Sequence, residues 1–231
     1  FSTCYHAPIK IYQIERILAE KATYAIEFLK KFWQIYPIPD IFRIDNGLQF
    51  RGTASGKRAI GKFLIFLLNL GVTPLFGSPS KPWTNPHVEG HNRVFNEKVW
   101  NTNHFTSLEQ IDKECRRFNR ESEELFKFKY ASFIVNNRNI FKYIEKEQSI
   151  NTFRLESVKN KKICFTRFAE SLDDGKSAQI VIMNETVSIP EKYAHQFVFV
   201  EWDLEKEQLF IYSEYQKVRT LIKKQGFKIN F

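Results

Sequence analysis

Cysteine, glycine and proline are scarce in this chain of 231 residues, and each shortage excludes a class of protein. The three cysteines, Cys4, Cys115 and Cys164, are widely spaced. Their odd number and the lack of a Cys-x-x-Cys pair exclude a disulfide framework or a zinc ribbon and favour the reducing cytoplasm. With 9 glycines and 8 prolines the chain is neither collagen-like nor of low complexity. The longest apolar run, Phe63 to Leu68, is far shorter than the roughly 20 residues of a membrane-spanning helix. We therefore expect a soluble protein without a membrane span.

Apolar and basic residues are abundant instead. Hydrophobic residues make up 43% and aromatic residues 16% of the chain, which is enough for the core of one large domain or two small ones. The chain has 35 Lys+Arg and 26 Asp+Glu, a formal charge of +9. Residues 1–150 contain 22 basic and 15 acidic residues, against 13 and 11 in residues 151–231. A partner that carries negative charge is therefore expected to bind the first part.

One interval of the first part has no acidic residue at all. It covers the 43 residues between Asp45 and Glu89. Because acids number 26 in 231 residues, about five would be expected over this length. The basic residues of the interval are Arg51, Lys57, Arg58, Lys62 and Lys81.

The pattern of apolar residues predicts an α/β fold in the first part and an all-β fold in the second. In the first part, strands are predicted over residues 5–12, 41–45 and 72–76, and helices over residues 19–35, 57–70, from Pro86 onward and over 107–125. Strands are predicted in the second part over residues 162–168, 178–183, 186–189, 197–202, 209–212 and 218–222. We predict two domains, an α/β domain over residues 1–150 and a small barrel-like β domain over residues 151–231.

Asp45 and Glu89, which bound the acid-free interval, are the strongest candidates for catalysis. Asp45 ends a predicted strand and precedes an Asn-Gly turn, where a side chain is exposed at the edge of a sheet. Glu89 falls in the first turn of a helix that begins with Pro86. Carboxylates suit Mg²⁺ or Mn²⁺, and two such ions about 3.5 to 4 Å apart can drive phosphodiester cleavage and strand transfer.

The residues around this pair are specific enough to indicate a family. They are Asp45-Asn46-Gly47-x-Gln49-Phe50, then Gly71-Val72, Ser78-Pro79, Asn85-Pro86-x-Val88-Glu89 and Asn92. In this order they resemble the catalytic core of retroviral-type integrases and insertion-sequence transposases, which carry a D, D, E triad. The resemblance covers residues 1–130. It implies an RNase H-like core with Asp45 as the second acid and Glu89 as the third, a two-metal site for Mg²⁺ or Mn²⁺, and DNA transposition or integration.

The resemblance also implies partners and a missing residue. The partners are the DNA ends of the element, the target DNA and further copies of the chain in a synaptic complex, and the setting is the cytoplasm, in association with the nucleoid. In this family the first acid shortly precedes a segment similar to Phe1-Ser2-x-x-Tyr5. We therefore expect this chain to be an N-terminally truncated fragment that begins just after its first catalytic Asp. Whether it is by itself an active enzyme stays open.

Residues with basic or aromatic side chains around the two acids are candidates for binding DNA. Basic side chains would neutralise phosphates with little sequence readout, and an aromatic ring can stack on a base. Arg93 is the first choice, because it follows Glu89 by one helical turn. The full set of candidates is Arg51, Lys57, Arg58, Lys81, Trp83, Asn92 and Arg93. For Trp83 the alternative is that it fixes its loop to the core, and for Lys57 that it is solvated on a helix.

Other interpretations of the same residues stay open. Asp45 could serve only as an Asx-turn residue, and Glu89 only as a first-turn acid favoured by the helix dipole. His87 and His91 flank Glu89 at helical spacing and could bind Zn²⁺, although the order differs from His-Glu-x-x-His and no third ligand is evident. For the whole chain, the alternatives are a catalytically incomplete DNA-binding remnant of a transposase and an RNase H-like nuclease that cleaves without joining.

Overall fold

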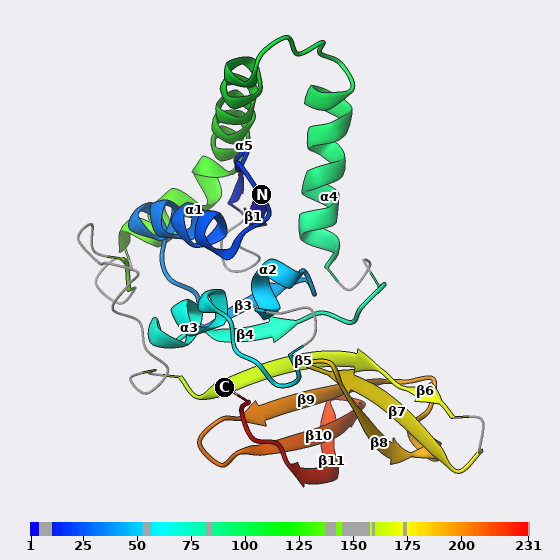
Figure 1. Ribbon diagram of the computed structural model, residues 1–231. Coiled ribbons are helices and arrows are strands. Elements are labelled where there is room, and N and C mark those ends of the chain that lie inside the picture. Colours follow the sequence, from blue (N-terminus) through cyan, green and yellow to red (C-terminus); the bar gives the residue numbers. More distant parts are fainter. Residues whose placement is uncertain are drawn as a thin grey trace. The chain divides into compact units, whose positions relative to one another are not determined.

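The computed structural model describes most of the chain in two compact units (Figure 1). The described residues are 1–4, 11–52, 56–81, 85–136, 142–144, 158, 160–172 and 175–230, with the backbone alone for 126–136. Unit 1 comprises Phe1–Ile38 and Asn85–Gln148, and unit 2 comprises Pro39–Thr84 and Ser149–Phe231. Each unit therefore combines two separate segments of the chain. The predicted domain boundary between residues 150 and 151 lies outside the described residues.

Unit 1 consists of helices and a two-stranded antiparallel sheet. The sheet pairs β1 (Ser2–Cys4) with β2 (Tyr12–Ile14), and the helical elements are α1 (Ala22–Ile35), α4 (Pro86–Phe95), the π-helical turn η2 (Asn96–Trp100) and α5 (Leu108–Asn136). Helices α4 and α5 run side by side and are joined by a loop (Figure 1). The buried side chains between them come from α4, η2 and α5 and are Phe95, Val99, Cys115 and Phe118. Part of the predicted strand over residues 5–12 is outside the described residues, and β2 begins at its last residue.

Helix α1 forms where the apolar spacing predicts a helix. Its buried face includes Ala25, Leu29 and Trp33. The helix ends at Ile35, and Tyr36 has an extended backbone because the residue before a proline is restricted to that region. The sequence therefore placed the end of this helix correctly.

Unit 2 is built on a six-stranded mixed sheet in the order β11-β10-β9-β5-β4-β3. Its strands are β3 (Ile41–Ile44), β4 (Thr73–Phe76), β5 (Lys162–Phe168), β9 (Phe197–Asp203), β10 (Gln208–Tyr215) and β11 (Val218–Gly226). β3, β4 and β5 are parallel, and β5, β9, β10 and β11 are antiparallel. The parallel connection between β3 and β4 contains helices α2 (Leu48–Arg51) and α3 (Lys62–Asn69).

A second sheet in unit 2 has three strands. It consists of β6 (Glu170–Ser171), β7 (Ser177–Ile182) and β8 (Glu185–Pro190), and the 3₁₀ turn η5 (Glu191–Tyr193) follows it. All six strands predicted after residue 151 are present. Four of them share the larger sheet with β3 and β4, because Leu75 and Phe76 of β4 pair with Cys164 and Phe165 of β5. The chain is therefore a mixed α/β protein in which the late strands continue the sheet that the early strands begin.

The helix predicted over residues 57–70 begins later than expected. Helix α3 starts at Lys62, and Lys57 and Arg58 lie in a turn. Two observations explain this. Arg58 has a positive φ of 57°, which a helix excludes, and the backbone at Gly61 passes so close to Gly52 that a Cβ on Gly61 would lie 2.5 Å from the Cα of Gly52. The C-terminal end is as predicted, since Gly71 follows with a φ of 84°.

Helix α5 is longer than the sequence pattern predicted. It continues to Asn136 instead of ending near Leu125. Its start is as predicted, because Ser107 accepts a hydrogen bond from the backbone of Gln110, 3.4 Å away, and the side chain of Gln110 accepts one from the backbone of Thr106 at 2.9 Å.

Within the described part of the chain, no helix has both the length and the apolar character that crossing a membrane requires.

Candidate functional site

Asp45 lies directly after β3, at the carboxyl end of the parallel pair β3 and β4. Its side chain is exposed, and its Oδ1 accepts a hydrogen bond from the backbone N–H of Gly47 at 2.7 Å. This is an Asx turn, which the alternative interpretation of Asp45 as a turn residue predicted. The turn uses one lone pair of one oxygen. Asp45 is exposed and forms no ion pair among the described residues, so its carboxylate can bind a cation.

Asn46 anchors the loop that carries Asp45. Its Nδ2 donates to the carbonyl of Gly77, 2.8 Å away, in the loop after β4. The backbone N–H of Gly77 in turn donates to the carbonyl of Ile44 at 3.0 Å. The next residue, Ser78, is buried and accepts a hydrogen bond from the backbone of Phe168 at 3.2 Å. The loops that follow β3 and β4 are therefore tied to one another and to β5.

A buried arginine, Arg167 on β5, also contacts the loop that carries Asp45. Its side chain is only 4% exposed, and its Nη2 donates to Oδ1 of Asn46 at 3.0 Å. Burial, with a contribution from the charge of Arg51, lowers the pKa of Arg167 to about 9. The sequence interpretation did not identify Arg167. A signal was present, because Ile163, Phe165 and Arg167 alternate on one face of a predicted strand, and an arginine in such a row is unusual.

Two of the arginines predicted to bind DNA, Arg51 and Arg58, interact with other side chains of unit 2. Arg51 donates from Nη1 to Oδ1 of Asn184 at 3.0 Å, and Arg58 forms an ion pair with Glu185 at 2.9 Å. Met183 and Asn184, both with positive φ, form the tight turn between β7 and β8, and Glu185 is the first residue of β8. Arg51 and Arg58 therefore hold this turn.

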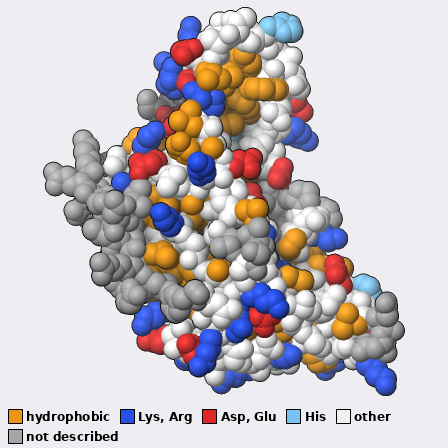
Figure 2. Space-filling model, in the orientation of Figure 1, with side chains coloured by type: hydrophobic (Ala, Val, Ile, Leu, Met, Phe, Trp, Pro, Cys, Tyr) orange, Lys and Arg blue, Asp and Glu red, His pale blue; other side chains and the backbone are white. Residues whose placement is uncertain are grey.

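Two other basic candidates of unit 2, Lys57 and Lys81, differ in exposure. Lys57 is exposed in the turn before α3. Lys81 is half-buried, and its Nζ lies 4.8 Å from the ring centroid of Phe168, which is a cation–π geometry. Trp83 lies outside the described residues. On the face drawn in Figure 2, Lys and Arg side chains are spread among acidic ones.

Glu89 lies in the first turn of α4 in unit 1. The helix begins with Pro86 at its first position, and the N–H of Glu89 donates to the carbonyl of Asn85 at 3.2 Å. The carboxylate of Glu89 is exposed and takes part in no ion pair among the described side chains. Arg93 on the next turn is exposed, with Glu97 at 3.8 Å, and Asn92 is half-buried. An ion pair this long and this exposed leaves Arg93 able to bind another anion.

His91, two residues after Glu89, is part of the core of unit 1. Its ring stacks on Tyr12 with centroids 4.7 Å apart, and its Nδ1 lies 3.1 Å from Oγ of Ser2. Burial lowers the pKa of His91 to about 4, so the ring is neutral at pH 7. A buried His91 beside an exposed Glu89 does not support the zinc interpretation of the His-Val-Glu-Gly-His segment.

The described residues contain no cluster of three or more His, Cys, Asp or Glu side chains that could hold a metal ion. Asp45 belongs to unit 2 and Glu89 to unit 1. Within its own unit, each is an exposed carboxylate with oxygen atoms accessible to a cation. This chemistry suits Mg²⁺ or Mn²⁺, which take few protein ligands and complete their coordination with water or phosphate oxygens.

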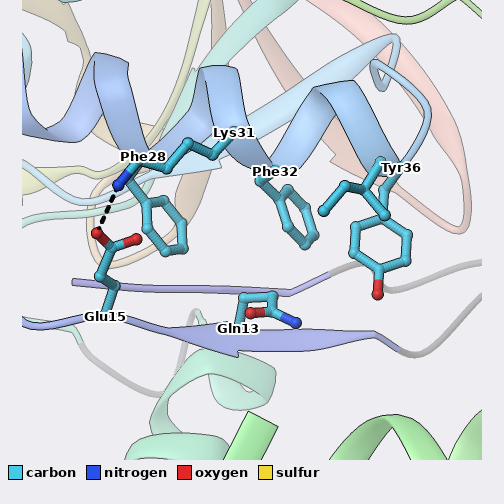
Figure 3. Close-up of a pocket in the computed structure, with 7 residues that line it drawn as sticks. Gln13, Glu15, Phe28, Lys31, Phe32 and Tyr36 are labelled. Carbon is cyan, nitrogen blue, oxygen red and sulfur yellow. Dashed lines mark hydrogen bonds and ion pairs between the residues drawn. The ribbon is translucent and has the colours of Figure 1, made fainter. Parts of the chain in front are cut away.

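A pocket in unit 1 contains none of the predicted site residues (Figure 3). It lies between α1 and β2 and has an ion pair between Lys31 and Glu15, 2.9 Å long, at one end. Its lining residues are Gln13, Glu15, Phe28, Lys31, Phe32, Ile35 and Tyr36. The pocket is mostly apolar, and it offers no arrangement for phosphodiester chemistry.

Sequence comparison assigns the chain to no known family. No protein-family model matches the chain, and no curated protein sequence matches it at a significant level.

Proposed function

We propose that this chain carries the catalytic acids of a DDE-type DNA transposase or integrase. The observation that carries the proposal is the position of Asp45. It is an exposed carboxylate at the carboxyl end of two parallel strands, where open α/β sheets bind their ligands. The ordered motifs from Asp45 to Asn92 support it further. In this proposal, the α/β part is an RNase H-like core, and the late strands, four of which extend the sheet of β3 and β4, contribute to DNA binding.

Each residue then has a defined task. Asp45 and Glu89 would each bind a divalent ion. The ions would lower the pKa of the attacking hydroxyl and stabilise the leaving oxygen. Arg93, Asn92, Lys57 and Lys81 would contact phosphates beside the scissile bond, and Trp83 a base. Arg51 and Arg58 would add positive charge while they hold the turn between β7 and β8.

Binding of Mn²⁺ to the 231-residue chain tests the proposal. Asp45→Asn and Glu89→Gln should each weaken Mn²⁺ binding, measured by electron paramagnetic resonance of the free ion. Asp40→Asn is the matched control for Asp45, because Asp40 is an exposed acid that precedes the same strand. Glu97→Gln is the control for Glu89, two helical turns further on. Equal Mn²⁺ affinity in all four variants would remove Asp45 and Glu89 from the proposal.

Activity separates the proposal from its alternatives. The protein should nick and join DNA in Mn²⁺, and Asp45→Asn should abolish both reactions. Cleavage without joining would indicate an RNase H-like nuclease. A second candidate is a catalytically incomplete DNA-binding remnant, which accords with the finding that no cluster of three or more His, Cys, Asp or Glu side chains occurs among the described residues. That candidate predicts DNA binding that is sensitive to salt and independent of Mn²⁺.

A further inference from the structure

Arg167 has an unusual environment for a charged residue. It is 4% exposed, and no carboxylate forms an ion pair with it among the described residues. Removing a cation from water costs several kcal/mol, so a buried arginine is retained only where its hydrogen bonds offset that cost. The hydrogen-bond partners of Arg167 therefore indicate its role in the structure.

Those contacts join separate parts of unit 2. The Nε of Arg167 donates to the carbonyl of Val181 on β7 at 2.8 Å, and Nη1 donates to Gly77 after β4 and to Thr166 at 2.9 Å. The remaining nitrogen, Nη2, donates to Asn46. Its Cζ lies 5.0 Å from the ring centroid of Phe165. One guanidinium thus connects the second sheet to the two loops at the carboxyl ends of β3 and β4.

Asn46 is the point at which this network reaches Asp45. Its amide is fixed at both ends, because Nδ2 donates to Gly77 and Oδ1 accepts from Arg167. The residue before it, Asp45, is in turn fixed by the hydrogen bond from Gly47 to Oδ1. With Asn46 fixed on one side and the Asx turn on the other, the carboxylate of Asp45 has a defined direction.

We propose that Arg167 is the positioning residue for Asp45, acting through Asn46. This inference rests on the proposed function for its meaning, since an oriented carboxylate matters where it holds a metal ion. It follows that the late strands, which carry Arg167, take part in forming the metal site and do not only bind DNA. A lysine could not replace Arg167, because a single ammonium cannot reach acceptors on Asn46, Gly77 and Val181 in the plane of a guanidinium.

A double-mutant cycle tests the inference. Arg167→Met and Asn46→Ala should each weaken Mn²⁺ affinity by about tenfold, the loss typical when a residue that orients a metal ligand is removed. The double variant should lose no more than either single one, because both act on one network. Losing a nearby positive charge would by itself tighten cation binding, so weaker binding in Arg167→Met indicates lost positioning. Arg219→Met, on β11, is the matched control and should keep the wild-type affinity.

Hydrogen exchange of the Gly47 amide is a second readout, and it requires no metal. This amide donates to Asp45, so Arg167→Met and Asn46→Ala should speed its exchange, while Arg219→Met should not. Unchanged exchange in both variants would overturn the inference, as would additive effects on Mn²⁺ affinity. If Asp45→Asn leaves Mn²⁺ binding intact, the proposed function fails, and exchange at Gly47 still decides the role of Arg167. If Arg167→Met does not fold, Asn46→Ala gives the answer.

Discussion

The side chain of Asn119 forms two hydrogen bonds with the backbone of Ile14, accepting from its N–H and donating to its carbonyl, each at 2.9 Å. Asn119 lies on α5 and Ile14 ends β2. The amide therefore acts as an additional strand partner for β2, which pairs with β1 alone in the two-stranded sheet. A sheet of two short strands is marginal without such support.

Replacing Asn119 should consequently destabilise unit 1. Asn119→Ala leaves a partly buried donor and acceptor of Ile14 without partners, which costs about 1–3 kcal/mol of unfolding free energy. Urea unfolding followed by circular dichroism measures the change. Arg120→Ala is the control, since Arg120 is exposed on the same helix and should change stability by less than about 0.5 kcal/mol. Equal stability of the two variants would show that the contact does not hold the sheet.

The close approach of Gly52 and Gly61 predicts a second effect on stability. A Cβ on Gly61 would lie 2.5 Å from the Cα of Gly52, and backbone atoms cannot move aside cheaply. Gly61→Ala should therefore cost about 1–3 kcal/mol, the usual range for overpacking. Gly226→Ala in the same unit meets nothing within 4 Å and serves as the control. Thermal unfolding of the two variants gives the comparison, and a Gly61→Ala midpoint at or above that of the control would contradict the prediction.

The depressed pKa of His91 predicts that stability falls in mild acid. The unfolded ring has a pKa of 6.5 and the folded ring a pKa of about 4. Between these values the unfolded state binds a proton that the folded state does not, so the unfolding free energy decreases as the pH is lowered from 6.5 to 4. His91→Phe keeps the aromatic stack and should reduce this dependence. Denaturation at a series of pH values measures this dependence of the unfolding free energy on pH. His104→Gln, at an exposed histidine, is the control. An unchanged slope of unfolding free energy against pH in His91→Phe would exclude His91 as the source of the dependence.

The buried thiols predict how each unit reacts with an alkylating reagent. Burial raises the pKa of the Cys164 thiol to about 12 and raises that of Cys115 as well. Because the thiolate is the reactive form, both should be alkylated far more slowly in the folded protein than in concentrated urea. Mass spectrometry after a pulse of iodoacetamide at rising urea concentration should report unit 2 through Cys164 and unit 1 through Cys115. Rapid labelling of Cys164 without urea would contradict its burial on β5.

The positions of most strands and helices follow from local sequence. Alternating apolar residues predicted β5 over residues 162–168 as it is found, and Pro37 predicted the end of α1. The helix start at residue 57 was predicted wrongly, because the approach of Gly52 to Gly61 is a contact between segments that no local pattern records. The pairing of β4 with β5 was not predictable for the same reason, since about ninety residues separate the two strands.

For the candidate site, the sequence by itself determined that Asp45 and Glu89 are exposed acids at a strand end and in a first helical turn, because an Asn-Gly turn and a Pro-initiated helix are local features. It determined the mixed α/β class in the same way. Only the tertiary structure decided that Arg51 and Arg58 hold a turn, that His91 is a core residue and that Arg167 reaches Asn46. These three outcomes depend on contacts between residues far apart in the chain, and the burial and hydrogen bonds of a side chain exist only once those segments meet.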